Sequence, residues 1–222
     1  MSAIECFYSS QGKFYRTSKG LVVPSAGSIC TALTKENFDY VGIASLEKAI
    51  LMGTGAHDVC CQYSLHLLKH LDSVVLPPMP AGFPGTIEEW DAAMGHALLQ
   101  VIDLFETYSV EPVGVEEVAV CSTYGFGGQP DLKCWMRYKG KRLLAVWDFK
   151  RVYALSLSHY LKLECYRMLD SFQDCKVSFI AWLNKTDRAK LIYCPNNAEY
   201  RAAICGTAGM LNFQISKRVL VP

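Results

Sequence analysis

The segment from Glu116 to Lys150 constrains the fold more than any other part of the chain. It holds three apolar, strand-like stretches with an acidic residue near each, separated by the glycine-rich turn Gly127-Gly128-Gln129-Pro130-Asp131 and ending in Asp148-Phe149-Lys150. Residues two apart in a β-strand point to the same face, so Asp148 and Lys150 are expected to face one cleft. Charged residues rarely occupy so apolar a strand without a partner or a metal ion.

Helical patterns flank these strands. Apolar spacing predicts helices over residues 44–71, 155–170 and 197–214, and Thr86 followed by Glu89 predicts a capping box for a helix that runs to about residue 108. A short helix is expected over residues 29–33, after a cap at residues 24–28. Gly53-Thr54-Gly55 either allows close helix packing or marks a boundary between two helices.

The strands expected from the apolar runs lie between and before these helices: residues 5–8, 13–17, 112–122, 132–138, 142–149, 176–183 and 189–193. The order of helices, three strands, helix, strands and helix predicts an α/β (α+β) fold with a mixed central β-sheet flanked by helices. No internal repeat or linker divides the 222 residues, so one domain is expected.

Bulk composition excludes several classes of protein. Half of the residues are apolar, no stretch approaches the roughly 20 apolar residues of a membrane span, and no secretory signal is visible. The protein is therefore expected to be soluble and cytoplasmic. The ten cysteines form no C-x-x-C pair, so neither a disulfide framework nor an iron–sulphur cluster is expected.

Charge is unevenly distributed along the chain. No lysine or arginine lies between Lys69 and Lys133, whereas seven lie from Lys133 to Arg151. A basic band beside an acidic pocket suits a phosphodiesterase. On charge alone, however, a solvated hairpin with its turn at Gly140 is the favoured interpretation.

The acidic residues predict a site for a hard divalent cation. Mg²⁺ prefers oxygen ligands and retains several waters, so Asp131, Asp148 and the backbone carbonyl of Phe149 suffice to bind it. Glu116 is expected to bind the metal directly or through water, or to orient the nucleophile. Lys150 is expected to position the attacking water or to offset charge in the transition state.

Glu116, the Gly128-Gln129-Pro130-Asp131 turn and Asp148-Phe149-Lys150 resemble the motifs of the PD-(D/E)XK nuclease superfamily, in particular its RecB-like, phage-exonuclease branch. The resemblance spans roughly residues 25 to 170 and implies a restriction-endonuclease-like core. It implies a single nuclease domain over residues 1–222, with an N-terminal helical portion at about 25–110 and a catalytic αβββαβ core at about 111–215.

Further motifs follow the same resemblance. Gly53-Thr54-Gly55-Ala56-His57 is similar to the branch's Gly-x-x-x-His motif, which implies that His57 contacts the metal. Lys162 to Tyr166 stands where the branch usually has Gln-x-x-x-Tyr, and Arg151 stands where a small hydroxyl residue is common. Arg151, Lys162 and Tyr166 are thus candidate DNA contacts. Strand alternation places Glu116 and Glu117 on opposite faces. Spacing in related sequences favours Glu116 as the functional acid.

Two aromatic residues beside the glycine-rich turn, Tyr124 and Phe126, have two open interpretations. They stack on the bases of a single strand, or they fill the core beneath the turn. A thiol hydrolase that uses Cys60 or Cys61 with His57 is less well supported, because neighbours on one helix turn rarely give nucleophile–base geometry.

The resemblance implies a Mg²⁺- or Mn²⁺-dependent deoxyribonuclease, an exonuclease acting on DNA ends or single strands in recombination, repair or phage replication. Its partners would be DNA, a recombination or replication protein and further copies of the chain, in a bacterial or phage-infected cell. A structure-specific endonuclease and a catalytically silent DNA-binding domain are the alternatives.

Overall fold

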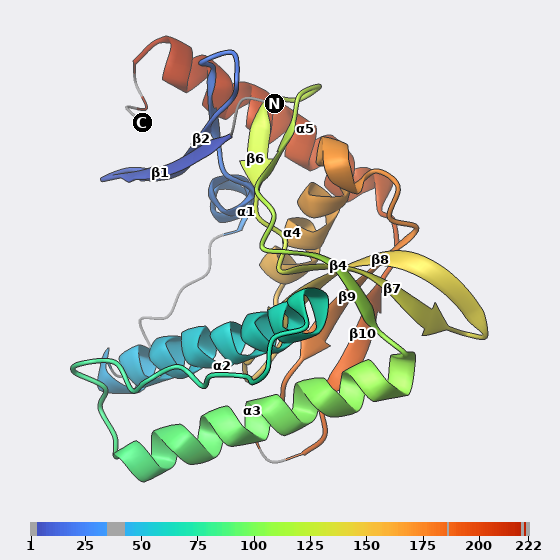
Figure 1. The fold of residues 1–222 in the computed structure, drawn as a ribbon. Helices are drawn as coiled ribbons and strands as arrows, with labels where there is room; N and C mark the ends of the chain where they lie inside the picture. The colour runs from blue at the N-terminus through green and yellow to red at the C-terminus, as the bar shows by residue number, and fades with distance from the viewer. Residues whose placement is uncertain (1–3, 35–42, 186, 219, 221–222) are drawn as a thin grey trace.

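The computed structural model describes residues 4–34, 43–185, 187–218 and 220 (Figure 1). Its centre is a five-stranded sheet in the order β10-β9-β8-β7-β4. All neighbouring strands are antiparallel except β8 and β9, which run parallel. The strands are β4 (Glu111–Val115), β7 (Leu132–Tyr138), β8 (Lys141–Lys150), β9 (Val177–Trp182) and β10 (Lys190–Cys194). The prediction of a mixed α/β fold is confirmed.

Helices cover both faces of this sheet (Figure 1). The paired helices α2 (Ile43–Lys69) and α3 (Ile87–Tyr108) pack on one face, with Trp147 and Phe149 of β8 in their shared core. The other face packs Val146 of β8 against α1 (Ala26–Leu33), α4 (Leu157–Met168) and α5 (Ala198–Ser216). Strand alternation therefore turns Asp148 and Lys150 toward the α4 side.

Two smaller sheets extend the α4 side of the molecule. Strands β1 (Glu5–Ser9), β2 (Gly12–Arg16) and β3 (Val22–Pro24) form an antiparallel sheet, and β5 (Ala119–Cys121) pairs with β6 (Phe126–Gly128). A 3₁₀ turn (η1, Asp170–Phe172) follows α4. The helix capping box at Thr86 and Glu89 is present as predicted.

The prediction of one β-segment over residues 112–122 is wrong. Strand β4 ends at Val115, Glu116 adopts a left-handed backbone conformation with φ of 50°, and β5 belongs to a different sheet. A non-glycine residue at positive φ cannot continue a strand, so the chain turns at Glu116.

Helix α2 runs without a break through the glycine pair, so of the two interpretations the structure selects close packing. A Cβ atom on Gly55 would lie 2.5 Å from Cη2 of Trp90 and 2.8 Å from Sδ of Met94, both on α3. For a Cβ atom on Gly53, the nearest neighbouring heavy atom is 3.9 Å away. No helix among the described residues has the length and apolar character that a membrane span requires.

We predict that Gly55→Ala lowers the free energy of unfolding by about 1–3 kcal/mol, because the added methyl group overpacks the α2–α3 contact. Gly53→Ala is the matched control. It has room for the methyl group and is expected to raise stability by about 0.5–1 kcal/mol, since alanine loses less conformational entropy in a helix. Urea unfolding of both variants measures the difference, and equal stabilisation by the two would contradict the packing.

Candidate metal centre

The glycine-rich turn brings Asp131 beside Asp148 across two neighbouring strands. Leu132 of β7 pairs with Trp147 of β8, so the residues that follow in this antiparallel register are Asp131 and Asp148. Oδ2 of Asp131 accepts a hydrogen bond of 2.7 Å from the backbone N–H of Phe149. Two acids from separate motifs therefore meet on the α4 side at one end of the sheet.

Asp148 is fully buried and lies between two lysines. Nζ of Lys150 is 2.5 Å from its Oδ2, and Nζ of Lys162, on α4, is 3.2 Å from its Oδ1. Burial works to lower the pKa of Lys162, but Asp148, Tyr166 and Asp131 together outweigh it and raise that pKa well above its usual value. This contact agrees with the expectation that Asp148 and Lys150 lie on one face of the strand, but neither residue lines the 720 Å³ cavity.

His57 of α2 lies beside Asp131. Its Nε2 lies 3.2 Å from Oδ1 of Asp131, and its side chain is 28% exposed. Burial favours the neutral ring, yet the contacts with Asp131, Glu116 and Asp58 raise the pKa of His57 to about 9. Burial likewise opposes the charge on Asp131, but His57, Lys150 and Lys162 hold its pKa well below the usual range.

Glu116 reaches the cluster because the chain turns at this residue, and not because of strand alternation. Its backbone N–H donates to the carbonyl of Asp131 at 3.1 Å. Its Oε1 lies 4.0 Å from Nε2 of His57. The carboxylate of Glu117 instead folds over Gly114, where a Cβ atom would meet its Oε1 at 2.6 Å. The prediction that strand alternation places Glu116 and Glu117 on opposite faces is wrong, because neither residue lies in a strand.

A cavity of about 720 Å³ opens beside these residues. His57, Glu116, Asp131, Lys162 and Tyr166 line its inner end. The outer wall comes from β2, the start of α1 and the glycine-rich turn, and includes Lys13, Ser28 and Gln129. Gly128 needs to be glycine here, since a Cβ atom would lie 3.1 Å from Cε1 of Tyr166.

Two of the candidate DNA contacts, Tyr166 and Arg151, are wholly or partly buried. Tyr166 is only 3% exposed and its ring lies 5.3 Å from Nζ of Lys162, so it supports that lysine. Arg151 follows β8 and is half-buried, and burial lowers its pKa. Arg151 does not line the 720 Å³ cavity.

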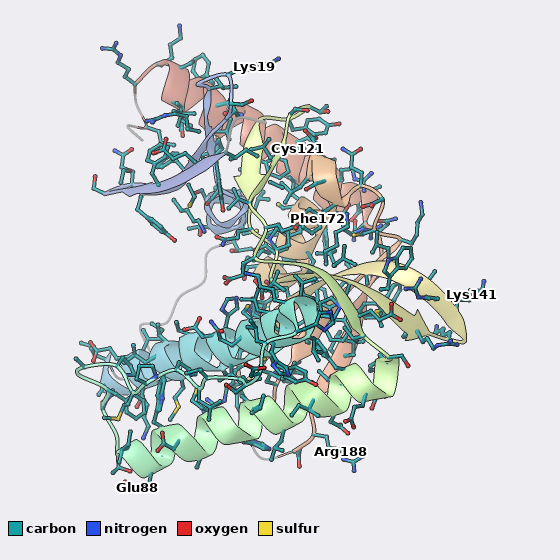
Figure 2. All side chains as sticks on the ribbon, viewed as in Figure 1. Lys19, Glu88, Cys121, Lys141, Phe172 and Arg188 are labelled. Carbon is teal, nitrogen blue, oxygen red and sulfur yellow. The ribbon has the colours of Figure 1, made fainter. Side chains whose placement is uncertain are left out.

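The base-stacking prediction is wrong for Phe126, which is completely buried among the side chains under α1, α4 and α5. Tyr124 is 42% exposed but lies at a different cavity, of about 500 Å³, with Cys121, Arg167, Lys176 and Arg201. Figure 2 labels Cys121, close to α5. Of the two interpretations, core filling therefore holds for Phe126.

Of the basic band, Lys150 contacts Asp148, but the residues of the β7–β8 hairpin lie away from the acids. Lys141 lies at the tip of the β7–β8 hairpin (Figure 2), seven residues from Asp148 along β8, which corresponds to about 23 Å. Lys133 pairs with Asp174 at 2.9 Å, and Arg142 pairs with Glu111 at 2.6 Å. The solvated-hairpin interpretation agrees with this placement.

Sequence reasoning missed two residues at the centre. Sγ of Cys61 lies 3.6 Å from Nε2 of His57, and its position four residues after His57 on α2 was a local signal. Nζ of Lys13 donates to Oε1 of Gln129 at 2.9 Å on the cavity wall. That contact joins residues 116 positions apart, so no local pattern predicts it.

The donors fit a divalent cation. His57 places its ring beside Glu116 and Asp131, and the oxygens of Asp148 and the carbonyl of Phe149 are held by lysine ammonium groups. The ammonium of Lys150 contacts both Oδ2 of Asp148, at 2.5 Å, and the carbonyl of Phe149, at 3.0 Å. These are two of the oxygens that the sequence assigned to the metal, and the ammonium shows that they converge on one positive charge.

Comparisons with known proteins do not assign a family. No protein-family model matches the chain, and no curated protein matches it by sequence. Among solved structures, the crystal structure of SSO0001 is similar over 70% of this chain and 74% of that chain, with 13% identity and a TM-score of 0.34. A similarity this low carries no argument about fold or function.

The raised pKa of His57 predicts a pH-dependent stability in the metal-free protein. The charged ring stabilises the folded state fully below its unfolded pKa of about 6.5, and this stabilisation is lost as pH rises through about 9. His57→Gln should therefore cost about 3 kcal/mol more at pH 6 than at pH 10. Urea unfolding of both proteins in EDTA measures this, and a pH-independent difference would contradict the pairing with Asp131.

Proposed function

We propose that the protein is a Mg²⁺- or Mn²⁺-dependent deoxyribonuclease with a PD-(D/E)XK, restriction-endonuclease-like core. The convergence of Glu116, Asp131, Asp148 and Lys150 beside His57 carries the proposal. These residues come from β8, the turn before β7, the turn after β4 and α2, so their proximity is a product of the tertiary fold.

Asp131, Asp148, the Phe149 carbonyl and His57 would hold the cation, with Glu116 beside them. A bound Mg²⁺ or Mn²⁺ lowers the pKa of a water molecule and polarises the scissile phosphate. A cation held by Asp148 and the Phe149 carbonyl would take the place that the Lys150 ammonium has in this structure. That ammonium then serves the attacking water or the charge that develops on the phosphate, which suits a compact, freely rotating donor.

Lys162 contacts Asp148 and reaches the same cavity, so it is placed to contact a substrate phosphate. Lys13 adds a second cation on the opposite wall. At about 720 Å³ the cavity falls within the size range of small-ligand sites, roughly 300–1,000 Å³. A space of that size accepts a chain end or a flexible single strand better than a rigid duplex, which favours an exonuclease over an endonuclease.

We predict that the protein degrades linear DNA when Mg²⁺ or Mn²⁺ is present and is inactive in EDTA. Asp148→Asn and Lys150→Ala should each lower the cleavage rate by about 10²–10³-fold, as loss of a positioned electrostatic group does in other enzymes. The assay follows release of labelled nucleotides from linear single- and double-stranded substrates.

Glu116→Gln and Glu117→Gln form a matched pair for this assay, because only Glu116 faces His57. The first should lose activity and the second should retain it. Nicking of covalently closed circles would favour the endonuclease instead. Full activity in Asp148→Asn, or DNA binding without cleavage under any metal condition, would overturn the nuclease proposal and favour the silent DNA-binding domain.

A further inference from the structure

Cys61 brings a sulphur atom to the candidate metal centre. It lies one helical turn after His57, and both side chains leave α2 toward the same place: Sγ of Cys61 is 3.6 Å from Nε2 of His57. Ligand atoms of His57, Cys61 and Glu116 all lie within 4.8 Å of one another. Asp131 adds a further oxygen 3.2 Å from the same His57 nitrogen.

Two of the separations around Nε2 of His57 match a tetrahedral ion, whereas Asp131 lies outside the group of ligand atoms within 4.8 Å of one another and joins it only after a side-chain movement. Zinc bonds of about 2.3 Å to sulphur and about 2.0 Å to nitrogen or oxygen place an S···N pair roughly 3.5 Å apart and an N···O pair roughly 3.3 Å apart at tetrahedral angles. The corresponding observed separations are 3.6 Å for Cys61 and 3.2 Å for Asp131. Glu116, at 4.0 Å, needs only a small movement of an exposed side chain.

The second nitrogen of His57 also has the partner that metal-binding histidines use. Its Nδ1 lies 3.4 Å from Oδ1 of Asp58, the next residue on α2. A carboxylate at this position fixes the tautomer that leaves Nε2 free to bind an ion and makes the ring more basic. Nε2 is the nitrogen that faces Cys61, Asp131 and Glu116.

Hard and soft cations use this donor set differently. Mg²⁺ binds oxygen and leaves a thiol without a role, whereas Zn²⁺ binds thiolate and imidazole strongly. We propose that Cys61, His57, Asp131 and Glu116 form a four-ligand Zn²⁺ site that overlaps the Mg²⁺ or Mn²⁺ site of the nuclease. Zn²⁺ binding transfers the Cys61 thiol proton and any His57 ring proton to solvent, and thiolate and imidazole each donate an electron pair to the ion.

The consequence is inhibition, and this part rests on the proposed nuclease function. Four protein ligands close the coordination sphere of zinc, and closed sites leave no position for water or substrate. Zn²⁺ would also withdraw His57, Asp131 and Glu116 from the catalytic ion. The net negative charge of zinc with one thiolate and two carboxylates is offset by Lys150 and Lys162, which pair with the adjacent Asp148.

Cobalt titration tests the site without any nuclease assay. Co²⁺ takes zinc positions, and its bond to a thiolate gives a near-ultraviolet charge-transfer band. Wild type should show this band at one equivalent, and Zn²⁺ should displace it. Cys61→Ser and His57→Gln should lose it, with affinity at least about 10-fold weaker. Cys60→Ser is the matched control and should keep the band, since Cys60 is not part of the ligand group.

Each outcome decides the proposal. No band in the wild type, or a band that survives in Cys61→Ser and disappears in Cys60→Ser, overturns the site. If Cys61→Ser is misfolded by circular dichroism, Cys61→Ala replaces it, and the wild-type titration alone still refutes an absent site. In the cleavage assay, micromolar Zn²⁺ should inhibit wild type at least about 10-fold more strongly than Cys61→Ser. Equal inhibition overturns the regulatory role, and absence of any cleavage refutes only the nuclease function.

Discussion

A carboxylate buried in an apolar sheet governs the rest of this structure. Asp148 is inaccessible to solvent, and an unpaired charge there would cost several kcal/mol. Lys150 meets this requirement from the same strand, and Lys162 meets it from α4. The pair of cations therefore fixes where α4 crosses the sheet, and Tyr166 below Lys162 fixes where Gly128 passes.

Charge balance across the centre connects stability with chemistry. Asp131 and Asp148 are each paired with cations from the protein, His57 for the first and the two lysines for the second. Under the proposed function, a divalent cation would offer the same neutralisation in one ion and would compete with the His57 proton and the Lys150 ammonium. The groups that stabilise the metal-free fold are thus the groups that must rearrange when a metal binds.

Local sequence patterns correctly predicted the structural features that depend on neighbouring residues in the chain. Strand alternation placed Asp148 and Lys150 on one face, and the capping box placed the start of α3. Alternation failed at Glu116, because a left-handed turn ends β4 there. Phe126 was equally ambiguous in sequence, since its burial depends on three helices that lie far away along the chain. Long-range packing therefore decided Phe126, whereas a backbone turn decided Glu116.

Cys61 shows how a local signal is lost. In the sequence, Cys61 and His57 on one helix turn were weighed only as a nucleophile and its base, and not as two ligands of one metal ion. Three faces of α2 are used at this level: Gly55 contacts α3, Cys60 enters the core, and His57 with Cys61 faces the acids. Because one rigid helix carries all three, the close α2–α3 contact sets the depth at which the imidazole and thiol reach Asp131.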